Sequence, residues 1–194
     1  MKGAYVTNIY QLDGKTILLK LRRSGQPIQQ LLIEAGRRAH LTSYDLKKPK
    51  RPPAFCMALR KHLKNSRIRD IYQHEFERIL IIELDTKIGI FKFIAELFGK
   101  GNIILVDPQG KIIHALTYRR MKDRSVVRGE TYRHPPSSGK NPLKINRQDL
   151  DELKIYGKIE VVKALTKLLS ISGFYAEDIL LQSGVNKKTP CSSL

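Results

Sequence analysis

The stretch YVTNIYQLDGKTILLKL, residues 5–21, decides the fold class of this chain. Two runs rich in apolar and β-branched residues, 5–12 and 15–21, flank the dipeptide Asp13-Gly14. Asp-Gly between two such runs is typical of a tight hairpin turn in which both residues take a positive φ. The sequence therefore predicts that the chain opens with two antiparallel strands.

Short β-rich runs continue outward from this hairpin through the first two-thirds of the chain. The expected strands cover residues 31–35, 39–42, 67–76, 78–84, 88–97, 102–107 and 111–117, with turns at 36–38, 85–87, 98–101 and 107–110. Residues 79–82 are all apolar, so side chains on both faces of a strand there would be apolar. This pattern predicts a strand buried on both faces. Many short strands at this spacing predict an α+β fold built on an antiparallel sandwich or barrel-like sheet.

Helical periodicity appears at one place inside this β-rich region and again near the C-terminus. Residues 54–63 form an amphipathic helix whose apolar face includes Phe55, Cys56 and Leu59, with Pro53 expected at its first position. Beyond a loop-like segment, helices are expected at 147–153, 158–169 and 174–183, the last closed by Gly184. We therefore expect a β-rich domain at 1–130, a linker at 131–146 and a helical domain at 147–194.

The charge balance points to a polyanionic partner. The chain holds 36 Lys and Arg against 18 Asp and Glu, a net charge of +18, whereas about 2–8 is ordinary for a small domain. Eleven basic residues and one acid lie between residues 37 and 69, and nine basic residues and two acids lie between 119 and 147. A merely solvated basic surface is the plainer interpretation, but the excess favours nucleic acid over an anionic membrane.

Motifs for catalysis or cofactor binding are incomplete in this sequence. Gly99-Lys100-Gly101 lacks the other residues of a dinucleotide or Walker loop and is better explained as a hairpin turn. His74-Glu75 lacks the second histidine of a metalloprotease helix, and Cys56 and Cys191 have no metal-site spacing. We therefore expect no metal, no cofactor, no small-molecule substrate and no enzymatic activity.

The sequence also bears on cellular location. Two widely spaced cysteines are typical of reduced thiols in a cytosolic protein. No apolar run approaches the length of about 18 residues that spans a bilayer, and no signal peptide is recognisable at the start. A cytoplasmic protein without a membrane partner is expected.

The C-terminal helices contain a second candidate anion site. A short connector precedes the helix at 174–183, so the backbone N–H groups at its start are free to hold a phosphate. The residues concerned are Ser172, Gly173, Phe174 and Tyr175. An ordinary αα-hairpin without a ligand explains the same spacing, and the spacing alone leaves both interpretations open.

Several stretches, in order along nearly the whole chain, resemble one known family. They are residues 6–10 (VTNIY), 39–42 (AHLT), 52–63 (PPAFCMALRKHL), 77–80 (ERIL), 101–107 (GNIILVD) and 173–180 (GFYAEDIL). Together they resemble the N-terminal domain of the NFACT family, the RqcH- and NEMF-type ribosome quality control proteins, many of which carry the older label "fibronectin-binding protein". The block at 52–63 is the most specific of these matches.

This resemblance implies a non-catalytic module that binds tRNA and the rRNA of an obstructed large ribosomal subunit, in support of C-terminal tailing of stalled chains. It also implies a fold similar to the N-terminal part of formamidopyrimidine-DNA glycosylases, followed by a small helix-hairpin-helix domain. The family's Asp-Arg pair, implicated in tRNA recognition, falls on Glu77-Arg78, where the acid is one methylene longer. The family's first helix, coiled coil and C-terminal RNA-binding domain have no counterpart here.

The residues expected to contact RNA combine this pair with nearby basic positions. They are Glu77, Arg78, Arg60, Lys61, Lys64, Arg37, Arg38 and Arg67. A DNA-binding or repair module of glycosylase-like fold is one alternative, although Met1-Lys2-Gly3 lacks the N-terminal proline that such enzymes use as nucleophile. A fibronectin-binding adhesin is another alternative, which the absence of a secretory segment disfavours.

Overall fold

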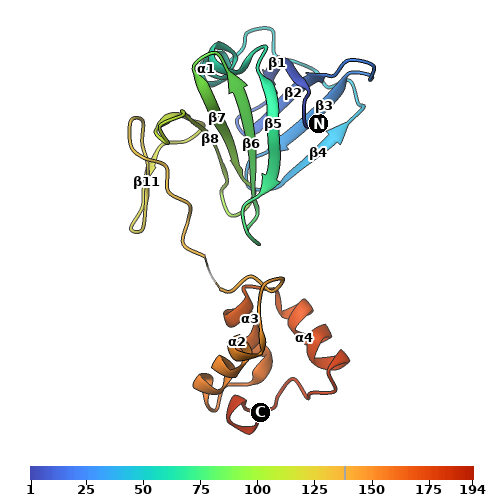
Figure 1. The fold of residues 1–194 in the computed structure, drawn as a ribbon, viewed down its shortest axis with the longest axis vertical. Coiled ribbons are helices and arrows are strands. Elements are labelled where there is room, and N and C mark those ends of the chain that lie inside the picture. The colour runs from blue at the N-terminus through green and yellow to red at the C-terminus, as the bar shows by residue number, and fades with distance from the viewer. Residues whose placement is uncertain (138) are drawn as a thin grey trace. The chain divides into compact units, whose positions relative to one another are not determined.

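The chain forms two compact units, Met1–Pro135 and Pro136–Leu194. The structure, a computed structural model, describes residues 1–137 and 139–194. Figure 1 shows the first unit as a β-rich body coloured blue to yellow-green and the second as a group of helices coloured orange to red. An α+β fold built on an antiparallel sheet is confirmed.

One nine-stranded antiparallel sheet forms the first unit, in the order β4-β3-β2-β1-β5-β6-β7-β8-β9. The strands are β1 (Tyr5–Gln11), β2 (Thr16–Arg22), β3 (Gln29–Glu34), β4 (Arg38–Thr42), β5 (Arg67–Gln73), β6 (Ile79–Thr86), β7 (Gly89–Glu96), β8 (Asn102–Val106) and β9 (Ile112–Ala115). A separate two-stranded ribbon pairs β10 (Arg119–Arg120) with β11 (Ser125–Val126). All seven further strands expected from the sequence are present, with ends that differ by up to three residues.

The opening hairpin is confirmed, but its turn differs from the expected one. Tyr10 lies opposite Leu18 in the β1–β2 register, and neither Asp13 nor Gly14 has a positive φ. Instead, the Asp13 carboxylate accepts hydrogen bonds from the backbone N–H groups of Lys15 and Thr16, at 2.7 and 2.8 Å. The aspartate therefore acts as a side-chain mimic of a turn, which the sequence pattern does not distinguish from a turn with positive φ.

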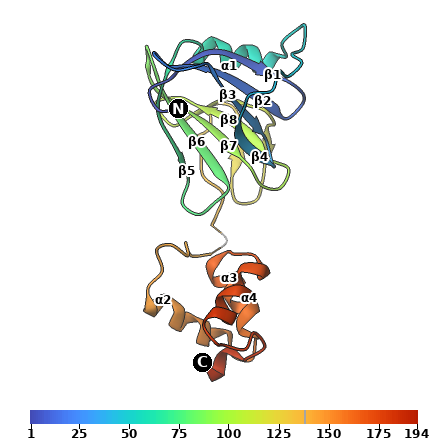
Figure 2. The same ribbon diagram turned by 90° about the vertical axis from the view of Figure 1, so that its right-hand side faces the viewer.

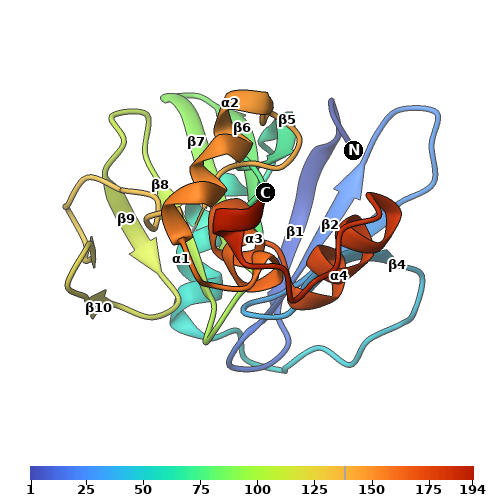
Figure 3. The same ribbon diagram turned by 90° about the horizontal axis from the view of Figure 1, so that it is seen from below.

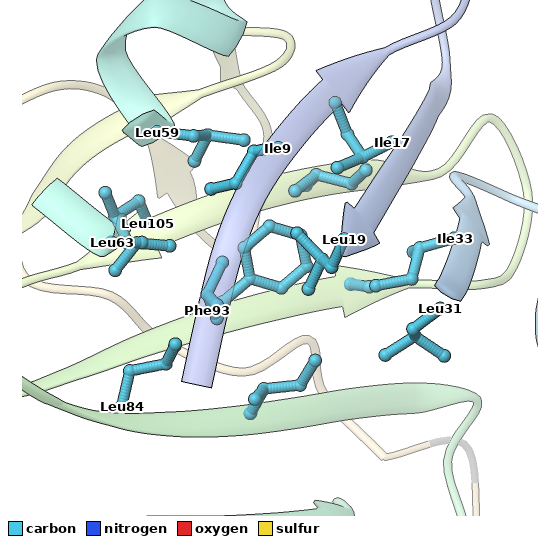
Figure 4. Close-up of a cluster of buried hydrophobic side chains, with 14 of the residues drawn as sticks. Ile9, Ile17, Leu19, Leu31, Ile33, Leu59, Leu63, Leu84, Phe93 and Leu105 are labelled. Atoms are coloured by element: carbon cyan, nitrogen blue, oxygen red, sulfur yellow. The ribbon is translucent and has the colours of Figure 1, made fainter. Parts of the chain in front are cut away.

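Strand β6 is buried on both faces, as the apolar run at 79–82 predicts. On β6, Ile82 and Leu84 join the main core, whereas Ile79 and Ile81 join a second cluster on the opposite face with Val126. The main core lies between the two halves of the folded sheet, and Figure 4 shows Phe93 at its centre among side chains from several strands. Burial on both faces holds β6 in one register, because a one-residue shift would exchange its two apolar sets.

Helix α1 (Ala54–Leu63) closes the main core along one edge, and Figure 2 shows it lying beside β1. Its buried residues Cys56, Leu59 and Leu63 face the sheet. Phe55 packs only partly against this core, in contrast to the fully buried Leu59. Pro53 is the residue that caps the helix, one position before the expected one.

The described residues of the second unit form three α-helices, whose ribbons are drawn in Figure 3. Their buried apolar side chains make a core of their own. The helices are α2 (Arg147–Asp151), α3 (Val161–Leu169) and α4 (Gly173–Gln182), with 3₁₀ turns η1 (Glu152–Tyr156) and η2 (Cys191–Ser193). The helix expected at 158–169 begins three residues later, because residues 157–160 form a turn that the backbone of Cys191 and Ser192 contacts. Gly184 has φ +69, as a C-terminal cap requires.

The segment 131–146 is divided between the units. Tyr132 donates its backbone N–H to Gly110 in the first unit, and the His134 ring stacks on His74 at 3.5 Å between centroids. On the other side, Lys140 bonds Asp149 and Glu152 of the second unit. The boundary between the two units therefore falls inside this segment, between Pro135 and Pro136.

Candidate nucleic-acid interface

Two neighbouring arginines and a third one about 40 residues later in the sequence meet at one end of the first unit. Arg37 lies in the β3–β4 turn, Arg38 is the first residue of β4, and Arg78 immediately precedes β6. The Arg78 guanidinium donates to the backbone carbonyl of Arg37, with an N···O distance of 2.6 Å. We call Arg37, Arg38 and Arg78 the arginine turn cluster; all three are exposed or nearly so.

Two interlocked glycine turns position this cluster. Gly36 in the β3–β4 turn and Gly101 in the β7–β8 turn have φ +79 and +68, and a Cβ on Gly101 would lie 1.9 Å from the Gly36 nitrogen. The Gly36 N–H donates to the carbonyl of Glu96 at 2.9 Å, and the Leu97 N–H donates to the carbonyl of Arg78 at 2.8 Å. Glycine is therefore required where the two turns touch, because any side chain would push them apart.

Glu34 partly neutralises the cluster. Its carboxylate accepts from Arg37 at 3.2 Å and from Arg38 at 3.0 Å. Partial burial acts to raise the pKa of the Glu34 carboxyl, but the hydrogen bonds and charges of the two arginines outweigh it and lower that pKa. Glu34 pairs with two of the three arginines of the cluster, so one negative charge is set against three positive ones.

Sequence reasoning missed one neighbour of the cluster, Lys100. The turn Gly99-Lys100-Gly101 is a hairpin connection between β7 and β8, as expected, and the exposed Lys100 sits where the turn touches Gly36. The only signal for it in the sequence is the Gly-Lys-Gly spacing itself. The lysine adds a further positive charge beside the arginine turn cluster.

The basic side of α1 is less uniform than its helical periodicity predicts. Arg60 is not a free surface cation: its Nε donates to the carbonyl of Ile9 at 2.6 Å, and its guanidinium lies 5.3 Å from the centre of the Tyr10 ring. The Arg60 side chain thus joins the helix to β1, and an RNA contact by this residue stays a prediction. Lys61 and Lys64 are exposed.

Lys61 and Lys64 line a groove of about 650 Å³ together with Lys87, which follows β6. Arg67, at the start of β5, is in register with Asp85 at the same end of the sheet. Strand β6 has 8 residues, so at about 3.3 Å per residue its two ends lie about 23 Å apart. The structure therefore separates the expected RNA contacts into two groups, one around Arg78 and one around Lys61 and Lys64.

The expected anion site in the second unit lies at the start of α4. Ser172 caps the helix without a side-chain hydrogen bond, and the first helical bond runs from the Ala176 N–H to the Ser172 carbonyl at 3.1 Å. The N–H groups of Gly173, Phe174 and Tyr175 precede that bond, which is the geometry of any helix start. Phosphate binding there stays a prediction.

Within residues 1–137 and 139–194, no group of three His, Cys, Asp or Glu side chains is arranged to hold a metal ion. In the same part of the chain, no helix is long and apolar enough to cross a membrane. Cys56 and Cys191 are both buried free thiols.

Comparisons with known proteins agree with this architecture. The chain is 35% identical over 183 residues to the "Archaeal Rqc2 homolog aRqcH" of Methanocaldococcus jannaschii, covering 91% of this chain and 27% of that protein. It is 33% identical over 181 residues to the "Ribosome quality control complex subunit NEMF homolog" of Drosophila melanogaster, covering 92% and 17%. The chain thus spans about a quarter or less of the length of these two relatives.

A solved structure shows the same fold. The N-terminal part of the fibronectin/fibrinogen-binding protein of Streptococcus suis superposes with a TM-score of 0.80 and 28% identity, over 97% of this chain and 75% of that one. The similarity to the glycosylase fold and the helix-hairpin-helix assignment stay predictions. Because the family described as NFACT N-terminal and middle domains matches residues 1–194, the whole of this chain belongs to that family.

Proposed function

We propose that this chain is the RNA-binding module of a ribosome quality control factor, which binds tRNA and the large ribosomal subunit in the cytoplasm without catalysing a reaction. Two kinds of observation support the proposal. The similar archaeal and fly proteins are named as ribosome quality control proteins. The net charge of +18 and its exposed basic surfaces favour a polyanion.

The single observation that carries the proposal is the hydrogen bond from Arg78 to the carbonyl of Arg37. It brings the arginine of the Glu77-Arg78 pair beside two further arginines, although 41 residues separate Arg78 from Arg37. Clustered guanidinium groups match phosphate oxygens and base edges through paired N–H donors, which lysine does not reproduce. The cluster is thus suited to an RNA contact.

The turn that carries Glu77 and Arg78 is held at both ends. The Glu77 N–H donates to the His74 carbonyl at 3.0 Å, and the Gln73 side chain donates to the Glu77 carbonyl at 2.9 Å. Arg78 itself leads directly into the buried strand β6. A contact residue on such a tethered turn loses little conformational freedom on binding, which favours affinity.

Replacing Arg78 by lysine tests this function. The charge remains but the paired donors are lost, so we expect Arg78→Lys to bind tRNA about five- to a hundred-fold more weakly, as a loss of about 1–3 kcal/mol implies. Fluorescence anisotropy with labelled tRNA at one salt concentration measures the change. Affinity for duplex DNA of equal length should stay the same.

Arg23→Lys is the matched control, because Arg23 is also exposed but lies outside the cluster, just after β2. It should leave tRNA binding unchanged. If Arg78→Lys and Arg78→Ala both bind tRNA as the wild type does, Arg78 has only a structural role in this chain. Binding of fibronectin without any affinity for RNA would favour the function named for the streptococcal structures.

Binding should also depend strongly on salt. Each neutralised phosphate contributes a slope of about −0.7 to −0.9 in log K against log salt, and we expect at least about four such contacts. Lys61→Glu with Lys64→Glu should make this slope shallower by about two contacts with little loss of stability, since both residues are exposed. An affinity that does not change with salt would contradict RNA binding through phosphates.

A further inference from the structure

The helix-end groove, as we call it, is a second basic surface made by residues from four parts of the first unit. Helix α1 contributes Lys61 and His62, β9 contributes His114, the turn after β11 contributes Arg128, and the β6–β7 turn contributes Lys87. Two adjoining hollows, of about 650 and 480 Å³, share Lys61 and His62 in their walls. The surface is therefore continuous across the end of α1.

The cations of this groove lack ion-pair partners. Within the described part of the chain, Lys61, Lys64, Lys87 and Arg128 make no salt bridge with an acidic side chain, unlike Arg37 and Arg38, which share Glu34. The one acid in the walls, Asp85, is paired with Arg69 at 3.4 Å. Four exposed and unpaired cations around a hollow leave a strongly positive site for an anion.

Two histidines lie at the centre of these cations. The ring centroids of His62 and His114 are 5.7 Å apart, and the His62 ring also stacks on Phe91, with 5.6 Å between the ring centroids. Both rings are half-buried. Two imidazole rings at this distance beside Lys61 and Arg128 share one electrostatic environment, so an anion bound there acts on both.

Partial burial lowers the pKa of both histidines. The charges of Lys61 and Arg128 lower the pKa of His62 further, and Arg128, His62 and Lys61 do so for His114. The charged groups that face the pair are thus all cationic, apart from the paired Asp85. These lowered pKa values favour the uncharged form of both rings, and a phosphate between the cations would favour their protonation.

We propose that the helix-end groove is a second surface for an RNA phosphate backbone, and that protonation of His62 and His114 raises its affinity for RNA. This inference rests on the proposed RNA-binding function and extends it to residues outside the arginine turn cluster. The groove lies at the far end of β6 from Arg78, so an RNA longer than about 23 Å reaches both surfaces. Protonation of both rings places two positive charges with 5.7 Å between the ring centroids. The negative charge of a phosphate between the rings offsets their repulsion.

The direction of the pH effect follows from the coupling between RNA binding and protonation of the two histidines. Bound phosphate raises the pKa of the two rings above the value in the free protein, so binding takes up protons. Affinity therefore rises as the pH falls from above the bound-state pKa towards the free-state pKa, and becomes constant below it. Lysine and arginine keep their charge throughout this range and contribute no slope.

The test uses oligouridine of about 20 nucleotides, whose bases do not titrate between about pH 5 and 8. We expect the wild-type chain to bind it about five- to ten-fold more tightly at about pH 5.5 than at about pH 7.5. His62→Gln with His114→Gln should remove most of this difference and leave the affinity at the higher pH within about two-fold. Anisotropy at constant salt measures both values.

His40→Gln is the control, because His40 is exposed on β4, outside the groove, and its replacement should leave the pH dependence unchanged. A second measurement needs no variant: NMR pH titrations of the wild type with and without oligouridine should show that the RNA raises the pKa of His62 and His114. Arg78→Ala should weaken binding at both pH values and preserve their ratio.

The outcomes separate the two proposals. If the double variant keeps the wild-type pH dependence, or if oligouridine leaves the two histidine titrations unmoved, the helix-end groove is not an RNA surface of this kind. If the wild-type chain binds no RNA at either pH, the proposed function itself is wrong and the inference falls with it.

Discussion

Glu96→Ala is expected to lower the free energy of unfolding of the first unit by about 3–5 kcal/mol, because it leaves a buried arginine without its partner. Glu96 and Arg124 are 4% and 9% exposed, and the two side chains are joined at 2.6 Å. The Arg124 guanidinium also donates to the carbonyl of Arg133 at 3.2 Å, which ties the segment after β11 to the sheet. Urea unfolding of the full chain, followed by circular dichroism, measures the loss.

Two comparisons make this prediction specific. Glu96→Leu combined with Arg124→Met removes both charges and should recover most of the lost stability. Lys163→Met breaks an exposed bridge to Glu160, 2.9 Å long, and should cost less than about 1 kcal/mol. A loss below about 1 kcal/mol for Glu96→Ala would mean that the Arg124 side chain can move into solvent at little cost in free energy. The pair would then not be a structural link.

Gly101→Ala is expected to be the most damaging of the glycine substitutions. The added Cβ would meet the Gly36 nitrogen at 1.9 Å and the Ala35 carbonyl carbon at 2.3 Å, and the residue has φ +68. The positive φ costs about 1–2 kcal/mol and the forced separation of the turns about 1–3 more. Because the same turns hold the arginine turn cluster, tRNA affinity should fall about ten-fold or more even where the variant stays folded.

Gly99→Ala is the matched control for this effect. Gly99 lies in the same turn with φ +53, but a Cβ there meets nothing within 4 Å. The free energy of unfolding of Gly99→Ala should therefore fall by only about 1–2 kcal/mol, the cost of the positive φ, and its tRNA affinity should stay unchanged. Equal losses of stability and affinity in the two variants would contradict the role of the close contact. Thermal unfolding and anisotropy on the same samples give both quantities.

Local pattern was sufficient for much of the fold. The hairpin at β1–β2, the helix Ala54–Leu63 and the burial of β6 on both faces all follow from periodicity and turn residues within about ten positions. The helix near residue 160 was predicted to start too early, since its amphipathic pattern continues into a turn that distant residues of η2 hold in place. Periodicity shows which face of a helix is apolar, but it does not show where contacts with distant residues make the helix begin or end.

The candidate interface was only partly predictable. Basic side chains at Arg60 and Arg124 look the same in the sequence as those at Lys61 and Arg128. In the structure Arg60 bonds the carbonyl of Ile9, and Arg124 is a buried partner of Glu96. Whether a cation is a structural link or a free surface charge depends on groups 28 to 51 residues away, which no local pattern contains.

Composition and periodicity determined that this chain builds an antiparallel sheet with an added helical unit and an excess of positive charge, because these properties depend on residue type and short-range spacing. Tertiary structure alone decided that Arg37, Arg38 and Arg78 form one cluster, held by Gly36 against Gly101, and that His62 and His114 meet among unpaired cations. The physical reason is that a sheet folded onto itself brings together turns whose separation along the chain bears no relation to their distance in space.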